Sequence, residues 1–118
     1  MYSLRVEGSF SSAHNLRGYK GKCEELHGHN WRVEVVVKSQ ELDKIGLVID
    51  FKELKKKLKS VLEEMDHKYL NKFGYFKKAN PTSENIAKYI YKKLSLKLPL
   101  LSSVTVWENP TASATYEE

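Results

Sequence analysis

The residues best suited to metal chemistry gather in one short stretch of the chain. Residues 23–31 read CEELHGHNW and hold the single cysteine, Cys23, and two of the four histidines, His27 and His29. In an extended strand alternate side chains share a face, so both imidazoles can reach one ion while Gly28 faces away. Imidazole is a common zinc ligand, and the pair predicts a metal site that needs a third ligand.

His14 is the expected third ligand. It ends a stretch, residues 2–14, in which apolar and polar residues alternate as in a half-buried strand. An antiparallel hairpin sets the end of one strand beside the start of the next, so His14 can join His27 and His29. Three imidazoles leave one position open on a tetrahedral zinc, as in catalytic sites. The alternative is that each imidazole is simply hydrogen-bonded in the core or at the surface, and for this spacing we favour the metal.

Cys23 has three candidate roles. A single cysteine cannot form an internal disulfide, so it is an inert core thiol, a fourth ligand that closes the zinc site, or a free thiol beside an open site. A closed site would be structural, and the protein would then be a non-catalytic zinc-binding assembly module. A thiol near a divalent cation and a further histidine ionises readily and could act as a base.

Further along the chain, other residues suit acid–base chemistry or substrate binding. Asp66 and His67 are adjacent, and such a carboxylate can orient and tune an imidazole base; the alternative is a histidine that interacts with the dipole of a helix C-terminus. Glu108 ends a predicted strand, either as a solvated charge or as the acceptor for a heterocycle with adjacent N–H donors. Thr82 and Ser83 first of all begin a helix, with any substrate contact secondary.

The elements that must position these residues are four strands and two helices. Alternation of apolar and polar residues predicts the strands, which cover residues 2–14, 29–39, 103–108 and 112–116. Apolar residues at helical spacing predict helices that begin after Asp50 and Thr82, with Glu53 as the reciprocal partner of Asp50 in a capping box. The order predicts an α+β fold, a four-stranded antiparallel sheet with two helices on one face. Its open edges favour pairing between subunits.

Composition bounds the class of protein. A chain of 118 residues has the usual size of one domain, so residues 1–118 are expected to form a single domain. No run approaches the ~20 apolar residues of a membrane span, so we expect no membrane partner. Arg5 interrupts the N-terminus where a secretory signal would be apolar, which favours a cytoplasmic protein. The net charge of +5 owes much to lysines in residues 52–59, a pattern typical of a solvated helix face rather than of nucleic-acid binding.

Five motifs, taken in order, resemble those of one known family. They are FSSAH over residues 10–14, CxxxHGHN over 23–30, DHxxLN over 66–71, PTSENIA over 81–87 and ENPxAxAxY over 108–116. This ordered set is similar to the 6-pyruvoyl-tetrahydropterin synthase and 6-carboxytetrahydropterin synthase family and runs across nearly the whole chain. The resemblance implies a tunnelling fold, in which the sheets of neighbouring subunits join into a barrel, trimers form and two trimers stack into a hexamer.

The resemblance also implies roles for individual residues. The zinc (Zn2+) ligands would be His14, His27 and His29. Cys23 would be the catalytic base, Asp66 with His67 would complete a proton relay across a subunit boundary, and Glu108 would anchor a pterin ring.

The substrate implied by the resemblance is a small molecule, 7,8-dihydroneopterin triphosphate, and the enzyme would be a zinc-dependent lyase. The three residues between Cys23 and His27 resemble the queuosine-pathway branch, which releases acetaldehyde and triphosphate and leaves 6-carboxy-5,6,7,8-tetrahydropterin. The alternative branch, 6-pyruvoyl-tetrahydropterin synthase, eliminates triphosphate from the same substrate and tends to have a longer gap. In branches that use a glutamate base, Glu24 or Glu25 would share the role of Cys23.

Overall fold

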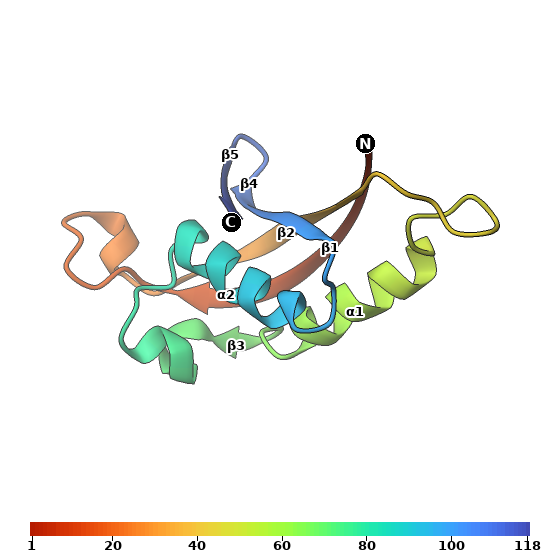
Figure 1. Ribbon diagram of the computed structural model, residues 1–118. Helices are drawn as coiled ribbons and strands as arrows, with labels where there is room; N and C mark the ends of the chain where they lie inside the picture. The colour runs from red at the N-terminus through yellow and green to blue at the C-terminus, as the bar shows by residue number, and fades with distance from the viewer.

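The chain folds into one five-stranded sheet with two α-helices on one face (Figure 1). The computed structural model describes residues 1–118. In chain order the elements are β1 (Tyr2–His14), β2 (His27–Ser39), α1 (Phe51–Glu63), β3 (Lys68–Tyr69), α2 (Ser83–Ser95), β4 (Leu101–Asn109) and β5 (Ala112–Glu117). Short 3-10 turns lie at Lys22–Glu24, Leu70–Lys72 and Gly74–Lys77. The strand order in the sheet is β3-β1-β2-β4-β5.

The predicted α+β fold is confirmed, but the sheet has one strand more than the four predicted. The additional strand, β3, pairs in parallel with Ser12 and Ala13 of β1, whereas the other pairs of strands are antiparallel. A strand of two residues is too short to show alternation, so the sequence pattern could not reveal it. β3 matters for the site because it holds the segment after α1 against the end of β1 that carries His14.

β1 and β2 form a long antiparallel ladder that sets two histidines side by side. Tyr2 pairs with Ser39 at one end, and His14 pairs with His27 at the other, with no shift of register between them. The connection between the strands runs through the turn Lys22–Glu24. The hairpin expected from the sequence therefore forms, and its open end carries the candidate metal ligands.

The apolar face of the sheet is buried under the helices. The buried side chains of β2, none of which has exposed surface, are Trp31, Val33, Val35 and Val37. They belong to a single cluster of 23 buried apolar residues, to which α1 and α2 contribute their apolar faces. Removal of this area from water is the main driving force for the fold and makes the sheet a rigid support for the site.

Both helices begin at the predicted N-cap residues. A side-chain oxygen of Asp50 accepts the backbone N–H two residues on, at 2.8 Å, and Oγ1 of Thr82 accepts the N–H three residues on, at 3.1 Å. The capping box predicted for α1 is not formed, because Glu53 instead pairs with Nζ of Lys57 at 3.0 Å. The cap at Thr82 fixes the backbone just ahead of α2, where it meets the site.

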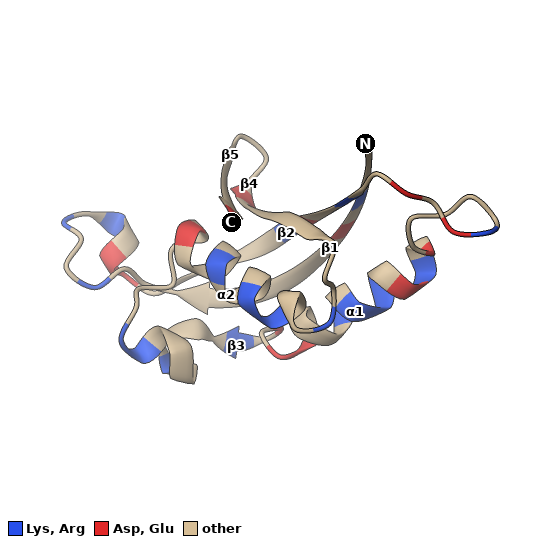
Figure 2. Ribbon diagram, in the orientation of Figure 1, with Lys and Arg blue, Asp and Glu red and all other residues tan.

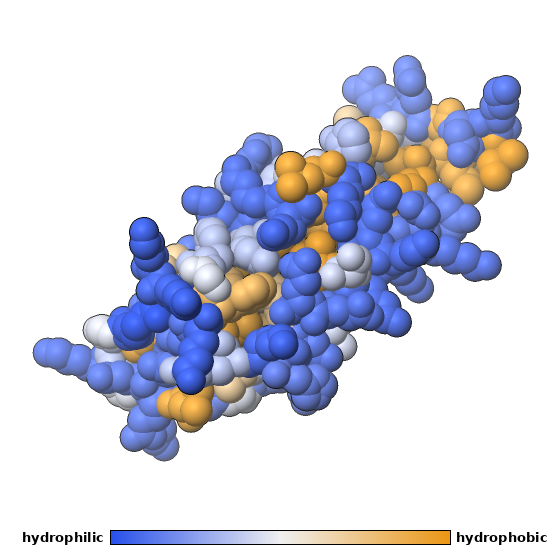
Figure 3. All heavy atoms as spheres, turned by 90° about the horizontal axis from the view of Figure 1, so that it is seen from below, coloured by the Kyte–Doolittle hydropathy of each residue, from blue (hydrophilic) through white to orange (hydrophobic).

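Polar and apolar side chains divide the outer surface. Lysines follow the outer faces of both helices (Figure 2). Figure 3 shows that hydrophobic residues gather at one end of the underside. The exposed apolar residues just before α1 and at its start include Leu42, Ile45, Leu47 and Phe51. None of the helices has the length and apolar character needed to cross a membrane.

The molecule is elongated, with open sheet edges. It measures 53 × 24 × 22 Å, and its radius of gyration of 15.2 Å exceeds the ~13.5 Å typical of a compact domain of this length. β3 covers only two residues of β1, so residues 2–10 present a free backbone edge, and the outer edge of β5 is also free. Such edges usually pair with another strand or are protected.

Candidate metal and active site

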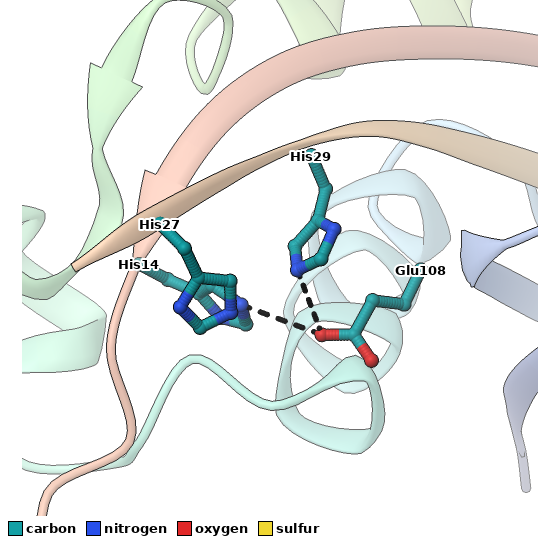
Figure 4. A group of neighbouring side chains, drawn as sticks. All are labelled: His14, His27, His29 and Glu108. Carbon is teal, nitrogen blue, oxygen red and sulfur yellow. Dashed lines mark ion pairs between the residues drawn. The ribbon is translucent and has the colours of Figure 1, made fainter. Parts of the chain in front are cut away.

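Three histidines and one glutamate point to a common centre (Figure 4). One ligand atom from each of four residues lies within 4.8 Å of the others, and these residues are His14, His27, His29 and Glu108. The ring centroids of the histidines are 4.5 to 5.1 Å apart. The structure thus brings together the three predicted ligands and adds Glu108 to them; we call this group the histidine cluster.

Strand register explains the grouping. His14 and His27 are cross-strand partners, and His29 lies two residues further along β2, on the same face. Glu108 follows the buried valines of β4 in alternation, so it lies on that face as well. The indole of Trp31 packs against the cluster, with its ring centroid 4.9 Å from that of His14. Each side chain therefore comes from a strand rather than from a loose loop.

Backbone carbonyls fix the orientation of two imidazole rings. Nδ1 of His14 lies 2.7 Å from the carbonyl oxygen of Pro81, and Nδ1 of His27 lies 2.7 Å from that of Glu25. A carbonyl oxygen only accepts, so each Nδ1 carries a proton and donates it, and each neutral ring keeps the lone pair of Nε2. Metal-binding histidines are commonly oriented by a hydrogen bond of this kind.

The Nε2 atoms of His14 and His29 are buried without a hydrogen-bond partner. Oε1 of Glu108 lies 3.4 Å from the first and 3.1 Å from the second. Nε2 of His14 keeps its lone pair because Nδ1 of that ring donates to Pro81, and an ionised carboxylate cannot donate to a lone pair. Buried acceptors that face one another are unfavourable unless a cation or a proton lies between them. Imidazole nitrogens together with a carboxylate oxygen are the usual ligands of zinc, so the donor set fits that ion.

Burial lowers the pKa of His14 and of His29 below the ordinary value of 6.5. For His14 the hydrogen bond that its ring donates to the carbonyl of Pro81 opposes this lowering of the pKa, and the neighbouring imidazoles reinforce it. For His29 the charge of Glu108 opposes it, and His27 reinforces it. Since a neutral imidazole is the metal ligand, a lowered pKa keeps these nitrogens available at neutral pH.

Cys23 borders the histidine cluster without belonging to it. A hollow of about 370 Å³ is lined by Cys23, Glu25, His27, His29 and Glu108, together with Lys22 and Leu26. Cys23 is half-buried, and its backbone carbonyl accepts the N–H of Leu16 at 2.7 Å. Cys23 thus borders the cluster, and Glu108 rather than Cys23 completes the group of four.

The side chains of Asp66 and His67 lie within ion-pair distance of each other. Nδ1 of His67 lies 3.0 Å from one oxygen of Asp66, and the other oxygen accepts the N–H of Ser11 at 2.8 Å. The bond from Ser11, helped by His67, lowers the pKa of Asp66. α1 ends at Glu63, so His67 does not sit in its last turn. His67 has a φ of 57°, a conformation rare outside glycine and often found at functional positions.

His67 lines a different hollow from Cys23. His67 and His29 line a hollow of about 500 Å³ along with Ser11, Ser12, Ala13, Gly28, Asn30, Lys68 and Tyr69. The side chain of His67 is 83% exposed. Within one subunit the structure therefore does not bring His67 into the hollow that holds the thiol.

Thr82 and Ser83 stand at the start of α2, and their neighbour Pro81 touches the site. Thr82 is the N-cap, and Ser83 is half-buried as the first helical residue. Pro81 is buried, and its carbonyl holds the ring of His14. The visible contribution of this motif is therefore to orient a metal-ligand candidate.

Sequence reasoning missed that Glu108 lies among the histidines. The available signal was its alternation with Val104 and Val106, which assigns it to the buried face of the strand. It also missed the hydrogen bonds that Asn71 and Asn80 make to the loop after β1. Asn71 stood inside a recognised motif, but nothing in its spacing indicated a partner so far away in the chain.

Comparison with known proteins identifies the family to which this fold belongs. The family model for 6-pyruvoyl tetrahydropterin synthase matches residues 3–118. A 6-carboxy-5,6,7,8-tetrahydropterin synthase of Synechocystis sp. is 41% identical over 123 residues, which cover 98% of this chain and 93% of that one. A dihydroneopterin monophosphate aldolase of Pyrococcus furiosus is 41% identical over 103 residues, which cover 85% of this chain and 83% of that one.

A solved structure agrees with these sequence matches. The 6-pyruvoyl tetrahydropterin synthase of Caenorhabditis elegans superposes with a TM-score of 0.90 at 34% identity, covering 99% of this chain and 95% of that one. The predicted tunnelling fold is thereby confirmed for the single chain. Matches over nearly the whole length, in sequence and in structure, show that this chain belongs to the 6-pyruvoyl tetrahydropterin synthase family.

Proposed function

We propose that the protein is a zinc-dependent lyase that converts 7,8-dihydroneopterin triphosphate and water into 6-carboxy-5,6,7,8-tetrahydropterin, with release of acetaldehyde and triphosphate, as in queuosine-type biosynthesis. The observation that carries the proposal is the pair of buried, unpartnered Nε2 atoms of His14 and His29, which face Oε1 of Glu108. That arrangement calls for a cation. The Synechocystis relative supports the choice of product.

The zinc ligands would be His14, His27 and His29. Bound there, zinc would acidify the hydroxyl and carbon–hydrogen protons of the substrate side chain. The carbonyls of Pro81 and Glu25 hold two of the rings through Nδ1, which leaves Nε2 of each ring directed at the centre. The strands that carry the ligands lie on a packed core, so the three nitrogens need little rearrangement to bind an ion.

Cys23 is the proposed catalytic base. It lines the same hollow as His27 and His29, so its sulfur lies beside the place where the substrate side chain would bind. A cation held by the histidines favours the thiolate form of a neighbouring cysteine. Glu25 also lines this hollow and Glu24 does not, so Glu25 is the nearer candidate for a glutamate that shares the role.

Asp66 and His67 are proposed to complete a proton relay with the thiol of a neighbouring subunit. Asp66 is kept ionised by its bond from Ser11 and accepts from Nδ1 of His67, which leaves Nε2 of His67 free to exchange a proton. The exposure of His67, and its place in a separate hollow from Cys23, support a relay across the subunit boundary.

Glu108 is proposed to anchor the pterin ring by accepting hydrogen bonds from adjacent N–H groups of that ring. In the structure its Oε1 lies against the nitrogens of His14 and His29, so the carboxylate would turn away from them when the pterin binds. Substrate hydroxyls would then occupy the space beside the histidines. Contacts from Thr82 and Ser83 to the substrate would be secondary to their place at the start of α2.

We propose that the active protein is a homo-oligomer, a trimer or hexamer, with active sites between subunits. The free backbone edges of β1 and β5 and the elongated shape of the subunit support this assembly. The residues 1–118 would act in it as one domain, built around the single apolar cluster.

One observation favours a second candidate function, that of an aldolase. The aldolase of Pyrococcus furiosus is as identical to this chain as the carboxypterin synthase of Synechocystis, so identity does not choose between them. The solved Caenorhabditis structure belongs to a third kind, a pyruvoyl synthase. We favour the carboxy product on the three-residue gap between Cys23 and His27. A non-catalytic zinc module ranks lower, since the cluster has Glu108 and not Cys23 as its fourth member.

Metal removal tests the proposal. Protein stripped of metal by a chelator should release no triphosphate from 7,8-dihydroneopterin triphosphate, and added zinc should restore the release. His29→Ala is the matched control, which zinc should fail to restore. Undiminished turnover in the metal-free protein would overturn the zinc-dependent mechanism, and turnover of the monophosphate in preference to the triphosphate would favour the aldolase activity.

A further inference from the structure

Two asparagine side chains hold the loop that follows β1. Oδ1 of Asn71 accepts the N–H of Asn15 at 2.9 Å, and Nδ2 of Asn71 donates to the carbonyl of the same residue at 2.9 Å. In the same way, Oδ1 of Asn80 accepts the N–H of Arg17 at 3.1 Å, and Nδ2 of Asn80 donates to the carbonyl of Arg17 at 2.8 Å. Each side-chain amide therefore forms hydrogen bonds to both the N–H and the carbonyl of one residue, as the backbone of a neighbouring strand would. We call these four hydrogen bonds the asparagine clasp.

Further bonds hold the same two loop residues. The hydroxyl of Tyr69 donates to Oδ1 of Asn15 at 2.6 Å. The guanidinium of Arg17 donates to the carbonyls of Phe76 at 2.5 Å and Ala79 at 3.2 Å. The clasp therefore belongs to a continuous set of contacts between the loop and the segments around β3 and before α2.

A single backbone hydrogen bond connects the clasped segment to Cys23, the proposed base. Leu16 lies between the two clasped residues, and its N–H donates to the carbonyl of Cys23 at 2.7 Å. Asn15 and Arg17, on either side of Leu16, are held by Asn71 and Asn80, so the clasp restrains the backbone on both sides of the bond to Cys23. The residues between Leu16 and Cys23 include Gly18 and Gly21, both with positive φ, and belong to no strand.

We infer that Asn71 and Asn80 are positioning residues that set the place of the Cys23 sulfur beside the histidine cluster. The inference rests on the proposed role of Cys23 as the base. A base must come within ~2.6–3.2 Å of the proton it removes, so a thiol on a loosely held loop would transfer protons poorly. The bond from Leu16 holds the loop side of Cys23, and the clasp holds Leu16.

The placement of the two asparagines links the clasp to the rest of the site. Asn71 ends the short segment that begins with Asp66, and Asn80 directly precedes Pro81, whose carbonyl holds the ring of His14. The same two segments therefore carry the relay pair, orient one ligand ring and hold the loop of the base. Neither asparagine side chain forms a hydrogen bond to a residue of the histidine cluster.

Asn80→Ala is the variant that tests this inference. It removes the two side-chain bonds to Arg17 but keeps the backbone carbonyl of residue 80, which accepts from Thr82 and Asn85. Asp50→Ala is the matched control, because it removes the N-cap of α1, at the far end of β1 from the site, without touching the loop. Asn80→Ser serves as a milder variant should the alanine variant fold poorly.

Three readouts separate positioning from general stability. The first is amide hydrogen exchange at Leu16, expressed relative to exchange at the core residue Val35. The second is the rate at which iodoacetamide alkylates Cys23, the only cysteine in the chain. The third is the separate effect on kcat and on KM, measured on the zinc-loaded enzyme.

In Asn80→Ala we expect the Leu16 to Val35 exchange ratio to rise about tenfold, the alkylation rate to change, and kcat to fall about tenfold with KM and zinc content retained. Asp50→Ala should lower the melting temperature and leave all three readouts as in the wild type. An exchange ratio in Asn80→Ala or Asn80→Ser equal to that of the control would overturn the inference. Exchange needs no turnover, so this result stands whether or not Cys23→Ala proves the proposed base wrong.

Discussion

Nδ1 of His14 donates to the carbonyl oxygen of Pro81 across 2.7 Å, and this bond joins the end of β1 to the start of α2. The ring of His14 is almost completely buried, so the bond decides which nitrogen carries the proton. Nε2 is left as a lone pair directed at the centre of the histidine cluster. The proposed metal chemistry follows from this relationship and from its counterpart between His27 and Glu25.

Replacement of His14 by alanine is expected to abolish stable zinc binding. It removes one of three nitrogens, and even changes in the groups that orient a ligand weaken metal affinity about 10- to 100-fold. Zinc content after dialysis against a competing chelator measures the effect. His67→Ala is the control and should keep its zinc, because His67 lies outside the cluster. Equal zinc loss in both variants would show that the cluster is not the binding site.

Cys23→Ala is expected to lower kcat by about 10²- to 10⁴-fold, the usual contribution of a positioned base, without loss of zinc. Glu24→Gln should remain active, since Glu24 does not line the hollow at the cluster. Steady-state turnover with metal analysis on the same samples decides the matter. If Cys23→Ala turns over normally and Glu25→Gln does not, the base is Glu25.

The metal-free protein is expected to lose stability as the pH falls below about 6.5. Burial lowers the pKa of His14 and His29 in the folded protein, so the unfolded chain binds more protons in the window just below that value. The free energy of unfolding in urea, measured with chelator at several pH values, should therefore decrease on acidification. A His14→Gln, His29→Gln double variant should show a smaller decrease. An increase in stability over this window would contradict the burial argument.

Gly8→Val is expected to cost about 1–3 kcal/mol of stability through overpacking. A Cβ at this position would lie 2.9 Å from a methyl of Leu62 and 3.2 Å from one of Leu58, where α1 packs on β1. Gly74→Ala is the control, because a Cβ added there would meet no atom within 4 Å. Urea unfolding of both variants checks the prediction. A cost for Gly8→Val no larger than for Gly74→Ala would mean that the helix shifts freely.

Local patterns were enough to predict the long elements. Alternation in residues 2–14 and 29–39 predicted β1 and β2 because one face of each strand is buried and the other is polar. The helix starts followed from Asp50 and Thr82, whose capping depends only on neighbouring backbone. The missed strand, β3, is held by pairing with residues more than fifty positions away, so no local pattern could reveal it.

The site could be predicted where residue type and the alternation of side chains along a strand determine it. It could not be predicted where contacts between distant parts of the chain determine it. Parity brought His27 and His29 onto one face, and the hairpin brought His14 to them. The approach of Glu108 depends on side-chain direction as well as on the pairing of β4 with β2. The sequence could not decide between a pairing of Asp66 with His67 and a histidine that interacts with the dipole of a helix C-terminus. The pairing depends on tertiary hydrogen bonds between Ser11 and both residues.

The mass of the pterin formed from 7,8-dihydroneopterin triphosphate by the zinc-saturated protein tests the central claim most directly. We predict 6-carboxy-5,6,7,8-tetrahydropterin, with acetaldehyde and triphosphate in equal amounts, formed about 10²- to 10⁴-fold more slowly by Cys23→Ala. Unchanged substrate, or a pyruvoyl or hydroxymethyl pterin in place of the carboxy product, would contradict the account.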